Sequence, residues 1–124
     1  MNVLFDSDVL IEISRGRDAA LVERWTELSG SERTIFFSPI TSAELWAGAR
    51  PQEQSIIAGL FKSLRCATID ETTARLAGDF LHRYAASHHL KIADALIAAS
   101  AVQYRAALWT RNRMHFPMQE VEFY

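Results

Sequence analysis

Short runs of apolar residues alternate with longer amphipathic stretches along this chain. The short runs are rich in β-branched and aromatic residues, and they are residues 2–5, 34–37, 66–69, 106–110 and 121–124. Runs of this length and composition are typical of strands, whereas apolar positions three and four residues apart are typical of helices. The pattern predicts strands connected by helices, in the order β-α-β-α-α-β-α-α-β-β.

Capping and breaking residues indicate where several helices begin and end. Asp18 is expected to cap one helix that stops before Gly30, Pro51 to begin another, and Asp70 to cap a third. Strands that alternate with helices favour a largely parallel sheet, because parallel pairing needs helical crossovers. We therefore expect a single α/β domain over residues 1–124, with helices on both faces of the sheet.

One predicted helix differs from the others in its pattern. The stretch "IADALIAASAVQYRAAL", which begins at Ile92, is apolar nearly all round. Such a segment suits a helix buried inside the domain better than a half-exposed one. Asp94 lies near its beginning, where an acid among apolar neighbours needs an explanation.

Several polar residues follow the predicted strands. Asp6 ends the first run and Asp8 lies just past it, Glu44 follows the second run, Asp94 begins the buried helix, and Asn112 follows the fourth run. Ligands of open α/β sheets bind beyond the carboxyl ends of the strands, and all these residues map to that edge if the sheet is parallel. Converging carboxylates repel one another unless a cation lies between them, and oxygen ligands suit Mg²⁺ or Mn²⁺. The spacing therefore predicts a metal site.

Two of these acids also have purely structural interpretations. "TSAE" at residues 41–44 matches a capping box, in which Glu44 would only secure the start of a helix. Asp8 is expected to be the N-cap of a helix that runs to Gly16. The sequence leaves both interpretations of Glu44 open and favours the cap for Asp8.

Asp94 and Asp6 differ in how well local structure explains them. Asp94 suits the first turn of a helix by its charge, or it pairs with Lys91 one turn earlier. Asp6 ends an apolar run without a local cationic partner, so a structural role explains it least well. The set of acids is more informative than any one of them.

Composition and charge narrow the class of protein. The 124 residues are 49% hydrophobic and 23% charged, as in a soluble globular domain. The net charge of −2 neither implies a polyanionic partner nor excludes a local basic patch. The single cysteine, Cys66, reads as a small buried residue and cannot form an internal disulfide. Without a signal segment or a long apolar window, we expect a cytoplasmic protein that does not insert into a membrane.

Four ordered blocks of the sequence resemble a known family. They are "VLFDSDVLIE", "SPITSAELWAGA", "KIADALIAASAV" and "ALWTRNRMHF", and together they span nearly the whole chain. In this order and at these spacings they resemble PIN-domain proteins, specifically toxin ribonucleases of the VapC type. The resemblance implies a three-layer sandwich with a central, mostly parallel sheet flanked by helices. It also implies a Mg²⁺- or Mn²⁺-dependent endoribonuclease, a homodimer, and a cognate antitoxin that binds and blocks it.

The resemblance assigns roles to individual residues. Asp6, Glu44 and Asp94 match the catalytic, metal-binding acids of the family, and Ser7 matches a hydroxyl beside the first acid. Asp8 falls where the family has asparagine or another polar residue, and it is not assigned as a ligand. The acids would hold the ion that activates the water attacking the RNA phosphodiester, while Ser7 would orient ligands.

One position departs from the family pattern. Many PIN domains have a fourth acid where this chain has Asn112. An amide oxygen still orients a ligand or a water, so Asn112 stays among the expected catalytic residues. Because it brings no charge, a second metal ion should bind more weakly here.

Arginines follow the segments that carry the acids. A basic rim around an acidic floor would hold RNA phosphates, and its expected members are Arg15, Arg50, Arg111 and Arg113, with Arg17 nearby. The alternative for each is an ordinary solvated surface position.

Other distinctive residues receive plainer interpretations. His88 and His89 are expected at the surface, because no third ligand has the spacing of a zinc site, and His115 is expected to be structural or to face substrate. Four apolar residues on short helices fit core packing, a dimer face or an antitoxin groove, and the sequence does not rank these: Trp25, Ile57, Leu60 and Phe61.

Two rival functions remain open at this point. The serious one is a PIN-like module that binds RNA or protein without cutting, because the fourth acid is replaced by Asn112. The weaker one is a haloacid-dehalogenase-like phosphatase, whose nucleophile also lies in a D-x-D after an apolar run. Val9 and Leu10 stand where that family has a small turn residue and threonine, and no later lysine block is apparent.

Overall fold

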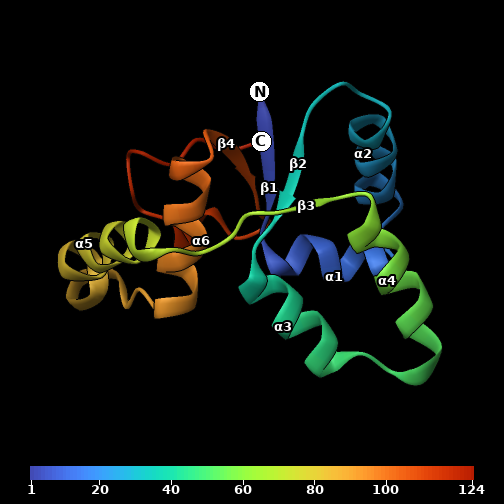
Figure 1. The fold of residues 1–124 in the computed structure, drawn as a ribbon, viewed down its shortest axis with the longest axis horizontal. Coiled ribbons are helices and arrows are strands. Elements are labelled where there is room, and N and C mark those ends of the chain that lie inside the picture. The colour runs from blue at the N-terminus through green and yellow to red at the C-terminus, as the bar shows by residue number, and fades with distance from the viewer.

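The computed structural model describes residues 1–124, and its centre is a parallel sheet of four strands in the order β3-β2-β1-β4 (Figure 1). The strands are β1 (Asn2–Phe5), β2 (Ile35–Phe37), β3 (Arg65–Cys66) and β4 (Ala106–Trp109). β1 lies in the middle, where Val3 pairs with Ile35 of β2 and Phe5 pairs with Trp109 of β4. Because every pair is parallel, the carboxyl ends of the strands meet at one edge, as predicted.

Helices cover both faces of this sheet. They are α1 (Ser7–Arg15), α2 (Ala19–Ser29), α3 (Pro39–Gly48), α4 (Gln54–Lys62), α5 (Glu71–His88) and α6 (Ile92–Gln103), with two short 3-10 helices, η1 (Pro51–Glu53) and η2 (Arg113–His115). In Figure 1, α5 and α6 lie on one side of the sheet and α1 to α4 on the other. The predicted order had one helix between the first two strands, and the structure corrects it to two.

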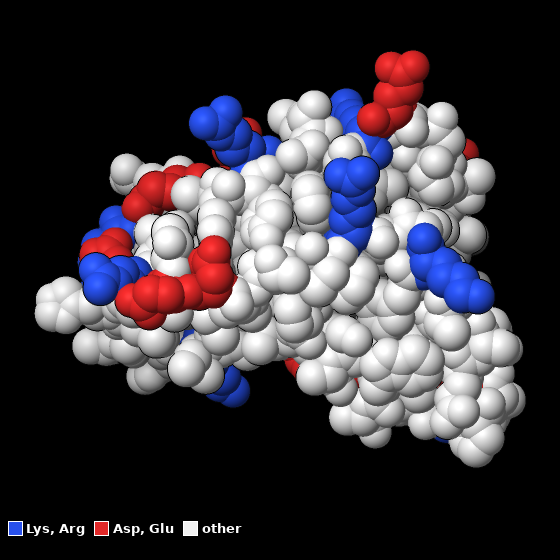
Figure 2. All heavy atoms as spheres, in the orientation of Figure 1, with Lys and Arg blue, Asp and Glu red and all other residues white.

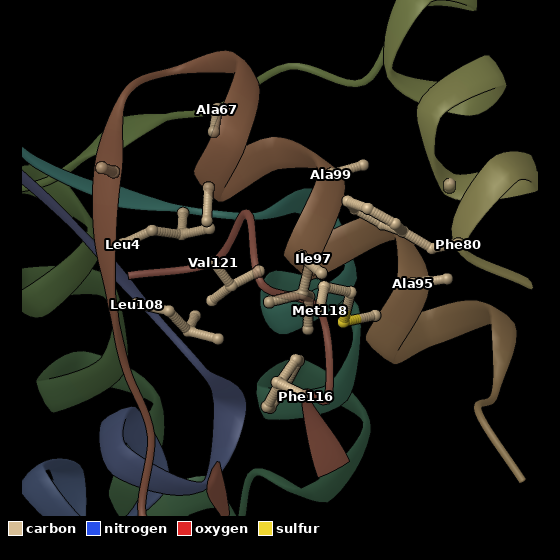
Figure 3. Close-up of a cluster of buried hydrophobic side chains, with 14 of the residues drawn as sticks. Leu4, Ala67, Phe80, Ala95, Ile97, Ala99, Leu108, Phe116, Met118 and Val121 are labelled. Atoms are coloured by element: carbon tan, nitrogen blue, oxygen red, sulfur yellow. The ribbon is translucent and has the colours of Figure 1, made fainter. Parts of the chain in front are cut away.

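The strands divide their side chains between two hydrophobic clusters. Successive side chains of a strand point to opposite faces, so Leu4 faces one side and Val3 and Phe5 face the other. Leu4 belongs to a cluster of 16 buried residues that includes Phe80 of α5 and Ile97 of α6 (Figure 3). Val3 and Phe5 belong to a second cluster of 12, which packs beneath α1 to α4. The predicted three-layer sandwich with a parallel sheet is confirmed.

The helix ends that depend on local sequence are where the pattern placed them. The Asp18 carboxylate accepts a hydrogen bond from the Leu21 N–H at 3.1 Å at the start of α2, and Asp70 caps α5 in the same way. Pro51 begins η1, and Gly30 follows α2. Gly16 ends α1 with a φ of 65°, a conformation that glycine adopts more easily than other residues.

The expected strand at residues 121–124 is wrong. This segment forms only one bridge to β4, between Leu108 and Phe123. Val121 turns into the first cluster, and the Tyr124 ring packs 5.1 Å from the Trp109 ring, measured between centroids. Its side chains therefore pack beside β4, and too few of its residues pair with β4 to form a strand.

Cys66 is exposed, which contradicts its expected burial. It lies on β3, the two-residue edge strand, and the next residue, Ala67, is the one that is fully buried. The α6 prediction is confirmed, because Ala95, Ile97 and Ala98 are all buried. None of the helices has the length and apolar character needed to cross a membrane.

Candidate active site

Asp6 lies at the carboxyl edge of the sheet, directly after the central strand. Its backbone N–H donates to the Trp109 carbonyl at 2.9 Å, which continues the pairing of β1 with β4. One carboxylate oxygen accepts from the Ser7 N–H at 2.8 Å, and the other accepts from the Thr110 hydroxyl at 2.8 Å. Asp6 is buried, and these two hydrogen bonds fix the positions of both carboxylate oxygens.

Asp6 is also the N-cap of α1, so the expectation that Asp8 caps this helix is wrong. The extended backbone at the end of β1 is what an N-cap residue needs, and Asp6 has a φ of −80° and a ψ of 155°. Asp8 lies in the first turn of α1 instead. Its carboxylate accepts from the Val9 N–H at 2.8 Å and from the Arg111 N–H at 3.2 Å. Asp8 thus ties α1 to the loop that follows β4.

Glu44 reaches the same edge from α3. Ser38 caps this helix and Pro39 begins it, so Thr41 lies inside the helix and the capping-box interpretation of "TSAE" is wrong. The Ser7 hydroxyl donates to Glu44 Oε1 at 2.9 Å and lies 2.9 Å from the hydroxyl of the fully buried Thr41. A serine has one hydroxyl hydrogen, so Thr41 donates to Ser7 and Ser7 donates to Glu44.

Asp94 approaches from the first turn of α6, as predicted, and is held more loosely. Its side chain is 26% exposed, and its nearest cationic partner is His115, whose Nδ1 lies 3.9 Å from Asp94 Oδ2. The expected pairing with Lys91 is not a direct contact. Asn112 is placed beside His115, with its amide nitrogen 3.1 Å from His115 Nε2, and its backbone N–H donates to the Thr110 hydroxyl at 3.0 Å.

The acids at this edge interact electrostatically. Burial raises the pKa of Asp6 to about 6; the Thr110 hydrogen bond opposes this rise, and the charges of Asp8 and Asp94 add to it. Burial also raises the pKa of Asp94, where His115 opposes the rise and Glu44 adds to it. The structure therefore brings together the acids that the sequence placed far apart.

Comparison with known proteins agrees with this architecture. The family model described as "PIN domain" matches residues 3–121. The chain belongs to the PIN-domain family. It is 39% identical over 119 residues to Ribonuclease VapC10 of Mycobacterium tuberculosis, covering 95% of this chain and 88% of that protein. It is 34% identical over 116 residues to Ribonuclease VapC19 of the same species, covering 93% and 92%.

Solved structures share the fold of this PIN domain. A VapBC2 structure from Rickettsia felis, bound to a DNA fragment from its promoter, matches with a TM-score of 0.84 and 21% identity, over 100% of this chain and 98% of that one. A toxin–antitoxin complex from Klebsiella pneumoniae matches with a TM-score of 0.76 and 28% identity, over 97% and 95%. The recognition of a VapC-type PIN domain from its four sequence blocks is confirmed.

The oxygen donors of this PIN domain fit a hard divalent cation. Mg²⁺ is commonly bound through one or two carboxylates and keeps several waters, and a cation beside Asp6 and Asp94 would stabilise the charged carboxylates, whose pKa values burial and, to a lesser degree, neighbouring acids raise. As the side chains stand, no three acidic, histidine or cysteine groups converge closely enough to hold one ion. Binding through two carboxylates and water fits this arrangement, whereas direct contact with all three acids would require side chains to rotate.

The arginines do not form a continuous rim. Arg15 lies 3.7 Å and Arg50 lies 3.5 Å from the Glu53 carboxylate, between guanidinium nitrogen and carboxylate oxygen. Arg111 lies 4.0 Å from Glu12, which also pairs with Arg17. Figure 2 shows one face of the molecule, on which lysine and arginine side chains are scattered, and acidic side chains gather, with basic ones among them, on the side that α5 occupies.

Two of the expected substrate-binding arginines lie near the acids. Arg15 lines a small hollow that Glu44 also lines, and the Arg111 backbone contacts Asp8. Arg113 turns away, with its guanidinium 4.9 Å from the centre of the Phe123 ring. In place of the predicted basic rim, the structure has separate arginines, each of which lies beside an acid or an aromatic ring.

The apolar residues on the short helices take part in the core. Ile57 is buried in the second cluster, and Trp25, Leu60 and Phe61 are half-buried against it. The sequence indicated no role for Thr110, and it indicated one for Thr41 only as the first residue of a capping box. Their hydroxyls contact Ser7 and Asp6 across 34 and 104 residues, so no local spacing could have indicated them.

Proposed function

We propose that this protein is a metal-dependent endoribonuclease and the toxin of a toxin–antitoxin pair. The observation that carries the proposal is Asp6, a buried carboxylate with a raised pKa, held at the sheet edge with Asp94 close enough to repel it. A protein maintains such an arrangement at a cost in stability, which is typical of functional sites. The identity to proteins named as ribonucleases supports RNA as the substrate.

Asp6, Glu44 and Asp94 would hold Mg²⁺ or Mn²⁺, partly through waters. The bound ion would offset the charge that develops on the phosphodiester and lower the pKa of the attacking water. Ser7 orients Glu44, because its hydroxyl hydrogen is committed to Glu44 Oε1. Thr110 fixes the second oxygen of Asp6, so this ligand keeps one orientation.

The remaining residues of the edge would position the RNA. Asn112 would orient a ligand or a water, as an amide beside His115 and close to Asp94. The side chains of Arg15 and Arg111 are 32% and 48% exposed beside the acids, and we propose that their guanidinium groups contact phosphates. Arg50 and Arg113 lie farther out and would contact longer substrates. Such contacts make RNA affinity fall as salt rises.

Protein partners belong to the same proposal. The solved relatives include toxin–antitoxin complexes, which supports a cognate antitoxin that blocks the site. Trp46 and Ile56 are 42% and 52% exposed on α3 and α4, and an apolar surface of this kind suits an antitoxin or the second copy of a homodimer. We place this activity in the cytoplasm, where the RNA substrate and the antitoxin would be available.

Cleavage of structured RNAs by the purified protein, free of antitoxin, tests the proposal. With Mg²⁺ we expect cuts that disappear in EDTA and fall by about 100-fold or more in Asp6→Asn, because the proposed ligand and its charge are lost. Asp8→Asn is the matched control two residues away, and it should lose less than about fivefold, since Asp8 contacts only backbone N–H groups.

Three outcomes would contradict this assignment. RNA that binds without any metal-dependent cut favours the non-catalytic module. Equal losses in the two variants overturn the distinction between Asp6 and Asp8. Covalent phosphate on Asp6 would indicate the phosphatase chemistry, although the match to residues 3–121 places the D-x-D in the PIN-domain family instead.

A further inference from the structure

A cavity opens beside Asp94, where the end of α5, the start of α6 and η2 meet. Its volume is about 230 Å³, and its lining residues are His88, His89, Leu90, Lys91, Asp94 and His115. Asp94 is the border between this cavity and the acid edge, so whatever occupies the cavity lies next to the reacting phosphate of the proposed nuclease.

The lining of the cavity is rich in nitrogen donors. Three imidazoles and one ammonium group face one carboxylate, which is a composition suited to an anion. The Lys91 side chain takes part in no ion pair in the structure, and its positive charge opposes binding of a metal ion here. His88 Nδ1 lies 2.7 Å from the Ser87 hydroxyl, which leaves its Nε2 free for a ligand.

His89 has a backbone conformation that glycine adopts more easily than any other residue. It ends α5 with a φ of 52° and a ψ of 36°, in the left-handed region that disfavours residues with a Cβ. The only other non-glycine residue with a positive φ is Arg105, also at 52°. A strained residue at the mouth of a cavity is a reason to look for a role of its side chain.

The start of α6 completes the cavity. Lys91 is the N-cap of this helix and provides no side-chain hydrogen bond to it, unlike Asp6 at α1. The first N–H groups of α6 thus lack a side-chain acceptor, and together with the charge of Lys91 they favour an anion.

We propose that this cavity binds one phosphate of the RNA chain, adjacent to the phosphate that is cut, through Lys91, His89 and the imidazoles of His88 and His115. The inference rests on the proposed function. The volume of about 230 Å³ is below the roughly 300–1,000 Å³ of ordinary small-molecule pockets, so it fits a phosphodiester unit and not a whole cofactor. Lys91 and His89 are therefore positioning residues that set the path of the RNA over Asp94.

Binding of a short single-stranded RNA in EDTA tests the proposal without cleavage. Lys91→Ala should weaken binding by about fivefold. It should also reduce the slope of log affinity against log salt concentration by about one, the value for one lost phosphate contact. The chain has one other lysine, Lys62 at the end of α4, and Lys62→Ala removes the same charge away from the cavity. It should leave the affinity within about twofold of the wild type.

His89→Gly separates the role of the side chain from its backbone strain. Arg105→Gly relieves the same left-handed strain elsewhere, so both variants should be at least as stable as the wild type. Only His89→Gly should weaken RNA binding, by about threefold, because it also removes a donor from the cavity.

The outcomes distinguish this inference from the proposed nuclease. Equal losses in the two lysine variants, wild-type binding by His89→Gly, or no binding of the RNA by the wild type would each overturn the phosphate site. A wild type that cuts RNA while Lys91→Ala binds normally refutes only the cavity. A wild type that cuts nothing but loses affinity through Lys91→Ala keeps the cavity and refutes the nuclease.

Discussion

Two helices begin at the acid edge, and they begin in opposite ways. α1 starts at Asp6, whose two carboxylate oxygens accept from the Ser7 N–H and the Thr110 hydroxyl and which is buried. α6 starts at Lys91 without a side-chain cap, and its acid, Asp94, is 26% exposed with a histidine 3.9 Å away.

The difference separates a fixed acid from an adjustable one. Asp6 is part of the fold as well as of the site, so it keeps its place whether or not a cation is bound. Asp94 has only a distant partner, so it is the acid that can adapt to an ion or to substrate. In the proposed metal site, one rigid and one adaptable acid would keep the position of the site without locking it into one geometry.

The largest effect expected from this contrast is on the dependence of folding stability on pH. The folded protein holds the Asp6 proton more tightly than the unfolded chain does, because the folded pKa is about 6 against 3.8. In EDTA, the free energy of unfolding should therefore fall by about 3 kcal/mol as pH rises from about 4 to about 6, and it should stay low above that. This amount corresponds to a shift of about two pKa units.

Asp6→Asn should remove this loss. At pH 8 in EDTA the variant should be more stable than the wild type by about 2 kcal/mol in urea unfolding, since a neutral amide avoids the cost of burying the charge. Asp18→Asn, at the N-cap of α2 away from the edge, should show no such gain. A loss of stability in Asp6→Asn at pH 8 would contradict the interpretation of Asp6 as a charge whose burial costs stability.

A somewhat smaller effect should come from the partner of Asp6. Thr110→Val removes the hydroxyl that donates to Asp6 and accepts from the Asn112 N–H, and it should cost about 2 kcal/mol in urea unfolding. Thr110→Ser keeps the hydroxyl and should recover most of the loss. At the other helix, Lys91→Ala should change stability by less than about 0.5 kcal/mol. Similar costs in Thr110→Val and Lys91→Ala would break the contrast.

The smallest effect is expected at Asn112, beside the adaptable acid. Asn112→Asp adds a carboxylate near Asp94 and should lower the Mg²⁺ concentration that gives half-maximal cleavage by about threefold, since affinity rises with ligand charge. Gln119→Glu adds the same charge outside the acid edge and is the control. An unchanged Mg²⁺ requirement in Asn112→Asp would show that this position takes no part in metal binding.

Local spacing was enough for the parts of the fold that local contacts determine. The caps at Asp18 and Asp70 were predictable because their hydrogen bonds join residues three apart. The parallel edge that collects Asp6, Glu44 and Asp94 was predictable because the alternation of strands and helices implies it. The roles of these acids as metal ligands stay predictions.

Long-range contacts account for the errors. Asp8 looked like a cap, yet its carboxylate contacts the Arg111 N–H, 103 residues away. The Arg15 guanidinium lies 3.7 Å from the Glu53 carboxylate of a different element, a contact that the sequence did not indicate, and its proposed role in binding RNA stays a prediction. Cys66 and Ala67 are both small, and only their positions, at the end of the edge strand and directly after it, decide that the first is exposed and the second buried.

The central place of β1 has a consequence for how the protein is made. Of the four strands of the sheet, β1 leaves the ribosome first and its neighbour β4 leaves last, and Asp6 meets Thr110 across 104 residues. Contacts this distant in sequence form late, because the loop between them must close first. A nascent chain that ends before Ala106 carries Asp6, Glu44 and Asp94 but not the strand that fixes Asp6. The complete acid edge therefore forms only after β4 and Thr110 have been synthesised, and chains that end before them lack it.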